Sequence, residues 1–562
     1  MPTFRFVSWS VLLCSLPCAF GQTPPDAGSL LRQVEQQRPL AKPEPGKPLN
    51  RPAADTGKTG IAPATRIRVQ AFVLEGHTLL DGTELQSLLQ PWVGHDLSLS
   101  DLREAAAAVC ARYAESGWLA HCDLPAQDVT DGLIRIRVLE ARMGGLRIEG
   151  EPQRIDPRRA EAMVLAASPR GERLSIVRTE RAVLLVSDLP GISASAALMP
   201  GHVEGETLVV LRLNDRALFG ANLSLDNAGQ RSTGTGRAMA STQWSGPLRL
   251  GDAWTLQLMH TAGSDYLRAA ASLPLGLDGW RLALAASGLR YRLQTDELAP
   301  LGGRGSALGA SLDLSYPLLR TRLRNVELRL SYKTDRFDNR AGGATTSHYR
   351  SRSASVALNA NSADEWGGGG ATALGLGWAS GRLNLAGSPN EAADAAGPGA
   401  NGGFGKLLYG ANRQQAITRW LSASLNLSGQ WTARNLDTSE RFYLGGPTGV
   451  RAYPASEGSG SRGELVSAEL RAQLPANFAL AGFYDRGHVQ GLVRGAVMGL
   501  GPNSYSLQGV GLAVTWSGPK ALALRATWAR RIGANPNPTL TGSDQDGTLV
   551  RNRLWLQASL PL

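Results

Sequence analysis

Several features that mark common classes of protein are missing from this sequence. After its N-terminus it has no apolar run of about 18 residues or more, so no transmembrane helix is expected. No nucleophile, general base and acid stand in an arrangement typical of a hydrolase or a redox enzyme. His488 stands close to Asp485 without a nucleophile, and we expect it to line a pore rather than to act in catalysis. The sequence therefore predicts neither an enzymatic activity nor a cofactor.

Cysteine is scarce, with four residues in the chain. Cys14 and Cys18 lie in an N-terminal segment that we expect to be removed, which leaves Cys110 and Cys122 in the mature protein. Export to an oxidising periplasm favours a disulfide between these two, and two separately buried thiols are the alternative that spacing alone leaves open. His121 is adjacent, but no further ligand is evident, so no metal site is predicted.

The net charge of +11 comes without a motif for nucleic acids. The basic residues are spread over strand positions such as Arg329, Lys333 and Arg471 and over loops, and there is no basic helix or RNA-binding aromatic motif. A polar barrel lumen and loops that face lipopolysaccharide explain the excess more simply. We therefore expect no nucleic-acid partner.

Alternation of apolar and polar residues is what the sequence has in abundance. From about Ala217 to Leu562 it runs in segments of roughly ten residues, which is typical of a transmembrane β-barrel. In Leu421–Trp431 the odd-numbered residues are apolar or glycine and the even-numbered residues are polar. Period two turns the first set toward lipid and the second toward a wet lumen. A globular β-sandwich also alternates, but tryptophans near the expected strand ends favour the aromatic girdle of a barrel.

The N-terminal region has two parts. Residues 1–21 are typical of a signal peptide, with Arg5 before an apolar stretch and small residues at the cleavage position. In residues 22–65, the segment Ser29–Arg38 predicts a short helix, and Leu40–Thr65 has the composition of a flexible linker. A short helix on a long tether suggests a mobile plug or latch, and a disordered periplasmic tail is the equal alternative.

A compact α+β pattern begins at Arg66 and occurs twice before the barrel. Residues 66–143 predict the element order β-α-α-β-β, starting with a strand over Arg66–Leu74. Residues 144–215 predict the same order again. One small fold of under about 80 residues is therefore expected to be repeated.

The most informative segment is the glycine-rich stretch Arg441–Pro454, in which Arg451 is the only cation of the central part. A later strand carries Asp485, which period two turns toward the lumen. We expect Arg451 and Asp485 to form an ion pair that locks the loop inside the barrel. The glycines that allow the tight inward turns are Gly445, Gly446 and Gly449.

These motifs together resemble a known family. The two repeats resemble POTRA domains, the first of them of the ShlB type, through Pro91-Trp-Val-Gly94 and Leu124-Pro-Ala-Gln127 in the first unit and Leu189-Pro-Gly191 in the second. With the Val450-Arg451 loop and the Phe483-Tyr-Asp485 strand, the mature chain is similar to the two-partner secretion transporters, also called hemolysin secretion/activation proteins.

The resemblance implies an outer-membrane barrel of sixteen strands over 216–562, with both POTRA domains in the periplasm. It implies that the sixth extracellular loop, about 432–464, follows strand eleven and folds inward. The residues of its lock would be Val450, Arg451, Tyr453 and, on strand thirteen, Asp485.

The resemblance also implies a function. The protein would be a pore that binds a large secreted exoprotein, a TpsA-type hemolysin or adhesin, through its POTRA domains and passes it outward without ATP. Outer-membrane lipids, lipopolysaccharide and the barrel-assembly machinery would be further partners. Two alternatives are a barrel-assembly factor, which usually carries more POTRA domains, and a passive porin or solute receptor, which leaves the POTRA pair unexplained.

The sequence departs from the family pattern at three places. Ala452 stands where a glycine usually follows the arginine, Gly460-Ser-Arg-Gly463 lacks the usual aspartate, and the chain ends in Leu562 rather than phenylalanine. The first two affect the geometry of the loop, but the arginine and the aspartate of the lock are both present.

Overall fold

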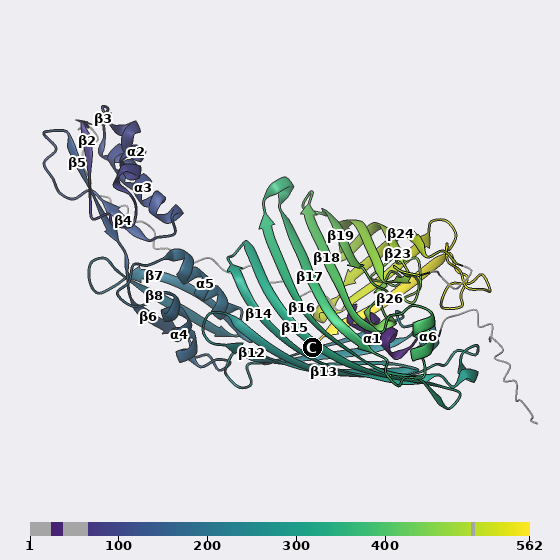
Figure 1. The fold of residues 1–562 in the computed structure, drawn as a ribbon. Helices are drawn as coiled ribbons and strands as arrows, with labels where there is room; N and C mark the ends of the chain where they lie inside the picture. The colour runs from purple at the N-terminus through teal and green to yellow at the C-terminus, as the bar shows by residue number, and fades with distance from the viewer. Residues whose placement is uncertain (1–23, 37–65, 496–500) are drawn as a thin grey trace, which may run out of the picture.

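The computed structural model of this protein describes residues 24–36, 66–495 and 501–562. The expected signal peptide, 1–21, and the expected linker, Leu40–Thr65, lie outside the described residues. Two small α+β units precede a β-barrel, and Figure 1 shows them as an arm that leads away from one end of the barrel. No helix within the described ranges is long and apolar enough to cross a membrane.

The barrel is closed and has sixteen antiparallel strands, as predicted. Each strand pairs with its neighbours, and β26 pairs with β9 to close the ring. The strands are β9 (Phe219–Asp226), β10 (Arg237–Ser245), β11 (Ala253–Thr261), β12 (Ser264–Leu275), β13 (Trp280–Arg292), β14 (Arg304–Arg320), β15 (Arg324–Ala341), β16 (Ala344–Asp364), β17 (Gly370–Asn384), β18 (Gly402–Ala416), β19 (Leu421–Thr432), β22 (Arg462–Gln473), β23 (Phe478–Gln490), β24 (Ser504–Ser517), β25 (Ala523–Arg531) and β26 (Asn552–Pro561).

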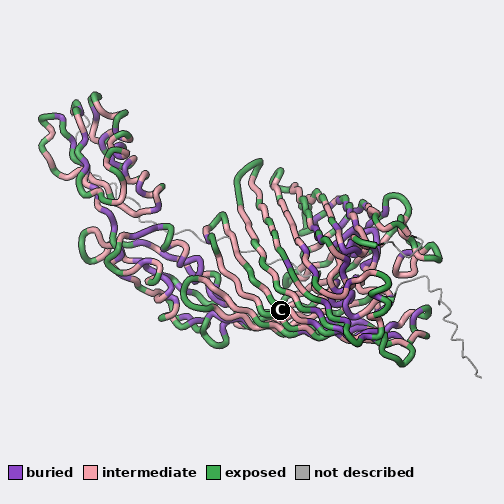
Figure 2. The backbone as a smooth tube through the Cα atoms, viewed as in Figure 1, coloured by how far each residue is buried: buried purple, intermediate pink, exposed green. Residues whose placement is uncertain are grey.

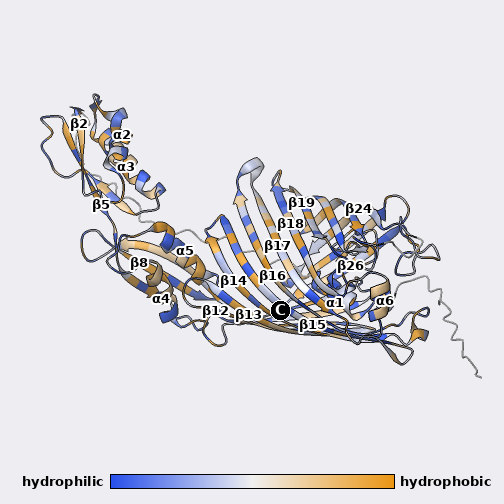
Figure 3. Ribbon diagram, in the orientation of Figure 1, coloured by the Kyte–Doolittle hydropathy of each residue, from blue (hydrophilic) through white to orange (hydrophobic). Residues whose placement is uncertain are grey.

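Side chains on each strand alternate between the outside and the lumen. On β19, Leu425 and Leu427 are 52% and 36% exposed and face outward, whereas Gln430 is 1% exposed and faces the lumen. Figure 3 shows apolar and polar residues alternating along the strands. Figure 2 shows that buried residues of the barrel gather in the half that lies farther from the α+β units. The lumen is therefore filled mainly at that end.

The two α+β units share one architecture. In the first unit, α2 (Gly82–Leu89) and α3 (Leu99–Glu115) pack on a sheet of order β2-β5-β4. In the second, α4 (Pro157–Ala167) and α5 (Ile176–Ser187) accompany a sheet of order β6-β8-β7. The strands of these two sheets are β2 (Ala71–Glu75), β4 (Ala120–Asp123), β5 (Leu133–Glu140), β6 (Arg142–Glu149), β7 (Ile192–Pro200) and β8 (Glu206–Asp215).

The expected single strand over Arg66–Leu74 is wrong in one respect, because the chain changes partner within it. A two-residue strand, β1 (Ile67–Arg68), pairs with β3 (Asp96–Leu97), and only from Ala71 does the chain join the main sheet through β5. Between them, the Val69 N–H donates to the carbonyl of His95 at 3.0 Å. The apolar pattern is the same whether the chain pairs with β3 or with β5, so the change of partner between β1 and β2 could not be predicted from the sequence.

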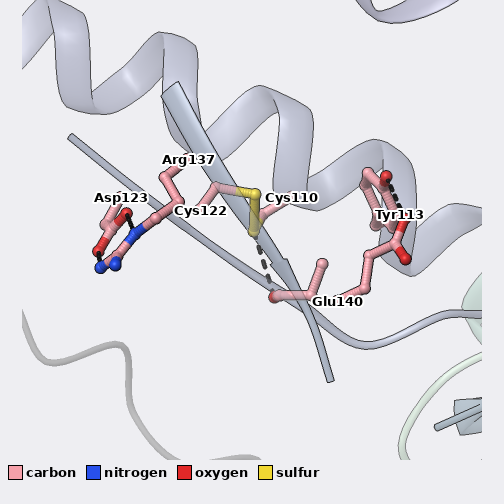
Figure 4. Close-up of a disulfide and its surroundings, with 7 residues drawn as sticks. Cys110, Tyr113, Cys122, Asp123, Arg137 and Glu140 are labelled. Atoms are coloured by element: carbon pink, nitrogen blue, oxygen red, sulfur yellow. Dashed lines mark hydrogen bonds and ion pairs between the residues drawn. A yellow bond between two sulfur atoms is a disulfide. The ribbon is translucent and has the colours of Figure 1, made fainter. Parts of the chain in front are cut away.

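A disulfide joins α3 to the edge of the sheet in the first unit (Figure 4). Cys110 and Cys122 are bonded, with Cα atoms 5.8 Å apart. Closing a loop of this size stabilises the folded state by about 3 kcal/mol in the chain-entropy account. On the same strand as Cys122, Asp123 accepts two hydrogen bonds from Arg137 of β5, at 2.6 and 3.0 Å. Both interactions fix β4 in place.

The two α+β units are held together by a buried carboxylate, Glu140, whose side chain is 1% exposed. It accepts hydrogen bonds from the Thr78 hydroxyl and N–H at 2.5 Å, from the Leu79 N–H at 2.7 Å and from the Tyr113 hydroxyl at 3.0 Å. Arg173 of the second unit pairs with it at 2.9 Å. Burial opposes ionisation most strongly, but the hydrogen bonds outweigh it and lower the pKa of Glu140. Only Ala141 separates β5 from β6, so the joint is short.

The second unit is docked on the barrel by ion pairs. Arg181 of α5 lies 2.5 Å from Asp278, in the turn that follows β12. Arg320, at the end of β14, lies 2.7 Å from Asp188, which follows α5. The turns after β12 and β14 therefore mark the end of the barrel that faces the α+β units.

We expect Glu140→Gln to destabilise the joint by about 2 kcal/mol, because hydrogen bonds to a charged group are lost. Since the folded-state pKa is lowered, this stabilisation is present above the ordinary pKa of 4.5 and is lost as pH falls through the folded value. The measurement is urea-induced protease sensitivity of the α+β units in the full-length protein at pH 7 and pH 4. Glu75→Gln is the control, because Glu75 is exposed and its partner Arg135 lies 3.9 Å away. Equal effects of the two substitutions would contradict the prediction.

Candidate functional site

The site lies in the lumen and is built on the segment between β19 and β22, residues 433–461, which we call loop 6. It includes the short helix η5 (Thr438–Glu440) and two short strands, β20 (Phe442–Tyr443) and β21 (Ser459–Gly460), which pair with each other. This position after the eleventh barrel strand is the predicted one. The segment folds inward, and its central residues Val450, Arg451, Ala452 and Tyr453 are at most 6% exposed.

Three glycines let the loop turn within the lumen, each for a steric reason. Gly446 has φ +98°, a conformation that other residues rarely adopt. A Cβ on Gly449 would lie 1.7 Å from the carbonyl oxygen of Leu444, and a Cβ on Gly445 would lie 1.9 Å from that of Pro454. Backbone therefore crosses backbone at distances that only glycine allows.

Arg451 at the tip of loop 6 meets the wall of the barrel. Its Nη2 and Nε lie 2.8 and 2.9 Å from the two carboxylate oxygens of Asp485 on β23, the thirteenth barrel strand. Its backbone N–H also donates to Asp485, at 3.1 Å. The guanidinium carbon lies 3.3 Å from the centre of the Phe483 ring. Asp485 is fully buried, so the pair is shielded from water on the carboxylate side.

A second carboxylate, Glu469 of β22, belongs to the same site and was not predicted. It accepts a hydrogen bond from Arg451 Nη1 at 2.9 Å. Ser467, two residues earlier, accepts from Arg451 Nη2 at 3.1 Å and donates to Asp485 at 2.7 Å. The signal was present in the sequence, since Glu469 and Ser467 lie on the lumen face of the strand that pairs with β23.

The other residues of the expected lock pack around the arginine. Val450 is fully buried in an apolar cluster with Leu444, Leu507 and Ala529. Tyr453 is 1% exposed, and the Arg531 guanidinium lies 4.9 Å from its ring centre. Loop 6 is thus held by apolar contacts as well as by charge.

Two of the departures from the family pattern are accommodated in the structure. Ala452 is fully buried, and it fits because residue 509 on β24 is glycine: a Cβ there would lie 2.6 Å from the Ala452 Cβ. In the segment that lacks the usual aspartate, Ser461 accepts from the Leu436 N–H at 3.0 Å and donates to the Gly491 carbonyl at 2.9 Å.

The N-terminal helix α1 (Ala27–Gln36) lies inside the barrel beside loop 6 (Figure 1). Glu35 pairs with Lys333 at 2.6 Å, and Asp26, just before the helix, accepts from the Thr438 hydroxyl at 2.7 Å. The helix begins two residues earlier than the predicted Ser29–Arg38, and residues 37 and 38 of that prediction lie outside the described residues.

Part of the lumen wall around α1 is apolar, which differs from the polar, wet inner face that the alternation predicts. Leu30 and Leu31 of α1 pack in a buried cluster with Tyr291, Phe337 and Tyr349 of the barrel wall. These wall residues occupy the lumen-facing positions of β13, β15 and β16. An apolar inner face is stable there because α1 covers it.

The expectation that His488 lines the pore is wrong. It stands three residues after Asp485, so the period of two puts it on the opposite face of β23. There its Nδ1 lies 2.9 Å from the Ser506 hydroxyl. In the part of the chain that the structure describes, no group of three or more His, Cys, Asp or Glu residues could hold a metal ion.

Family models match most of this architecture. Residues 205–506 match the model described as "Haemolysin secretion/activation protein ShlB/FhaC/HecB", and residues 67–141 match the ShlB-type POTRA domain. The chain is 26% identical over 560 residues to the heme/hemopexin transporter protein HuxB of Haemophilus influenzae, covering 94% of this chain and 95% of the relative. It is 25% identical over 436 residues to the outer membrane transporter CdiB of Dickeya dadantii, covering 73% and 74%.

Two solved structures have a similar fold. CdiB from Escherichia coli superposes with a TM-score of 0.69 at 20% identity, covering 95% of each chain. BamA from Haemophilus ducreyi lacking POTRA domains 1–3 superposes with a TM-score of 0.51 at 12% identity, covering 88% of this chain and all of that one.

We expect Arg451→Ala to leave the barrel closed but to free loop 6. Breaking a buried pair commonly costs about 3–5 kcal/mol because the partner charge is stranded, and lumen water reduces this cost. The measurement is trypsin cleavage after Arg441 in the detergent-solubilised protein, with heat-modifiable migration in gels as the check that the barrel has formed. The matched control is Arg486→Ala, since Arg486 follows Asp485 on β23 but is exposed on the outer face. Equal resistance of both variants would show that other contacts hold the loop.

Proposed function

Because the chain belongs to the haemolysin secretion/activation protein family ShlB/FhaC/HecB, we propose that it exports a large exoprotein of the TpsA type across the outer membrane. The barrel lies in the outer membrane and the POTRA domains lie in the periplasm. The protein is a secretion transporter whose partner is a secreted exoprotein.

The observation that carries the proposal is the way the lumen is filled. Two separate segments, α1 and loop 6, occupy it, and each is held to the wall by polar contacts and by a buried apolar cluster. Neither segment belongs to the ladder of barrel strands, so either can leave the lumen while the sixteen strands stay paired. The closed lumen is therefore the resting state of a pore that opens when its cargo arrives.

The α1 helix and loop 6 are coupled in this resting state. The Arg32 side chain donates to the Arg441 carbonyl at 3.3 Å, and Asp26 accepts a hydrogen bond from the Thr438 hydroxyl. We propose that α1 plugs the lumen and leaves it during export. Residues 37–65 separate α1 from the first POTRA domain, and this length of chain is sufficient for the helix to move out while it stays connected.

The second POTRA domain offers an edge for binding the exoprotein. Its sheet order β6-β8-β7 puts the nine-residue strand β7 at one edge. In the first domain the corresponding strand β4 is fixed by the disulfide, and Trp118 just before it pairs with Ser175. Strand addition by an extended segment of the cargo is thus favoured at β7.

Export proceeds without nucleotide hydrolysis in this proposal, and folding of the exoprotein outside the cell supplies the free energy. Lipopolysaccharide and other outer-membrane lipids surround the barrel, and the barrel-assembly machinery inserts it. A role as a barrel-assembly factor is less favoured, because the similarity to BamA concerns the fold alone. A passive porin is disfavoured by a lumen that holds both α1 and loop 6.

Deletion of residues 66–215 should abolish export and leave an inserted barrel, because the cargo is recognised by the POTRA pair. The measurement is the amount of exoprotein in the medium and in the periplasm, with heat-modifiable migration as the check for barrel insertion. Export at the level of the full-length protein would show that recognition lies elsewhere.

Deletion of α1, residues 27–36, should raise single-channel conductance in planar bilayers, because the helix occupies the lumen. Deletion of residues 45–54 from the linker is the matched control, since it removes the same number of residues and keeps the helix. Unchanged conductance after loss of α1 would exclude a plug and favour the alternative that this segment is a disordered periplasmic tail.

A further inference from the structure

Apart from Arg324 and Arg329, which lie nearer the other end of β15, eight exposed arginines lie toward the same end of five consecutive barrel strands, β13 to β17. We call this group the arginine patch. Its members are Arg290 and Arg292 on β13, Arg304 on β14, Arg336 and Arg340 on β15, Arg350 and Arg352 on β16, and Arg382 on β17.

The arginine patch faces the outside of the barrel. Tyr291, Phe337 and Tyr349 are buried in the lumen against α1, so the adjacent residues on the same strands point outward. On β14, Arg304 shares its face with Leu308, which is 63% exposed. The patch therefore continues the face that contacts lipid.

The patch also lies at the extracellular end of the strands. The opposite ends carry the turns after β12 and β14, which are docked on the second POTRA domain through Asp278 and Arg320. Toward the middle of the membrane, the outer face changes to Leu308, Tyr332 and Trp378. Arginine on the outer face is costly at the bilayer midplane and tolerated near the interface, where lipid phosphates lie.

Several of these arginines are direct cross-strand neighbours. Arg292 pairs in register with Arg304, which pairs in turn with Arg340. Like charges that stand directly opposite each other destabilise a sheet. The other like-charged pairs in register are Arg336 with Arg350 and Arg352 with Arg382. An anion between the strands would remove this repulsion.

Two carboxylates face the patch. Asp265 on β12 stands opposite Arg290 in register but contacts His260 at 2.6 Å, and Asp338 lies between Arg336 and Arg340 on β15. Arg336 lies 3.7 Å from Asp338, which also contacts His348. The side chains of the other seven arginines form no hydrogen bond or ion pair with any residue that the structure describes. Their guanidinium groups are free to bind ligand.

The remainder of the extracellular rim differs. On β18, the residues that continue the outer face beyond Arg382 and Ser380 are Gly403 and Gly405. Outer-face arginines farther around the barrel, such as Arg486 on β23 and Arg530 on β25, have no arginine opposite them in register. The positive charge is thus concentrated on one side.

We propose that the arginine patch binds the phosphate groups of lipopolysaccharide in the outer leaflet. The guanidinium group matches phosphate in a bidentate geometry, and adjacent strands present several such groups to one diphosphorylated headgroup. The acyl chains of the same lipid lie along the apolar outer face below. This site rests on the proposed contact of the barrel with lipopolysaccharide and names the residues that make it.

The test uses the purified full-length protein in a neutral detergent and measures binding of diphosphoryl lipid A by native mass spectrometry. Arg304→Gln/Arg340→Gln should weaken binding roughly tenfold, because two phosphate contacts are lost. Arg486→Gln/Arg530→Gln removes the same charge from the outer face elsewhere and should bind as the wild type does. Heat-modifiable migration checks that each variant is folded.

The site would be overturned by equal weakening by both double variants, by equal binding of dephosphorylated lipid A, or by equal binding of phosphatidylglycerol at the same concentration. Stronger binding of heparin than of lipid A would instead assign the patch to a soluble polyanion and overturn it as well. Export of the exoprotein is measured in parallel. If the protein exports normally but does not bind lipid A, lipid binding by the arginine patch is refuted and the proposed function is not. The proposed function is tested separately, by export in the POTRA deletion.

Discussion

The ion pair between Arg451 and Asp485 is the constraint on which the arrangement of the lumen depends. The aspartate is fully buried, and a buried carboxylate without a partner would be costly. The loop must therefore bring its arginine to the wall of the barrel, and the glycine turns that allow this leave little choice of path. Glu469 and Ser467 complete the set of acceptors, so the guanidinium group is satisfied from two adjacent strands.

The position of loop 6 in turn makes room for α1 and gives it a polar edge to bind. Loop 6 supplies Thr438 and the Arg441 carbonyl to the helix, while the barrel supplies Lys333 and an apolar wall. The two inserts fill the lumen together, although neither is part of the barrel ladder. Under the proposed function, both inserts can therefore move while the wall of the barrel stays closed.

The charges of the molecule are sorted by location. Inside the lumen, arginines and lysines such as Arg451 and Lys333 have carboxylate partners. At the periplasmic end, Arg181 and Arg320 are paired across the interface with the second POTRA domain. On the outer face of β13 to β17 most members of the arginine patch have no partner among the residues that the structure describes, and we propose that lipid phosphates supply the negative charge there.

The sequence by itself determined the barrel and the lumen-facing position of Asp485, because the period of two follows from the covalent geometry of a strand, whereas the number of strands was implied by the family resemblance. Only the tertiary structure decided that α1 lies in the lumen, that Glu469 shares Arg451, and that residues 67–75 change partner. These contacts join segments far apart in the chain, and they depend on how the barrel closes and which strands face each other across it. The periodicity of one segment contains no information on which distant segments it will contact.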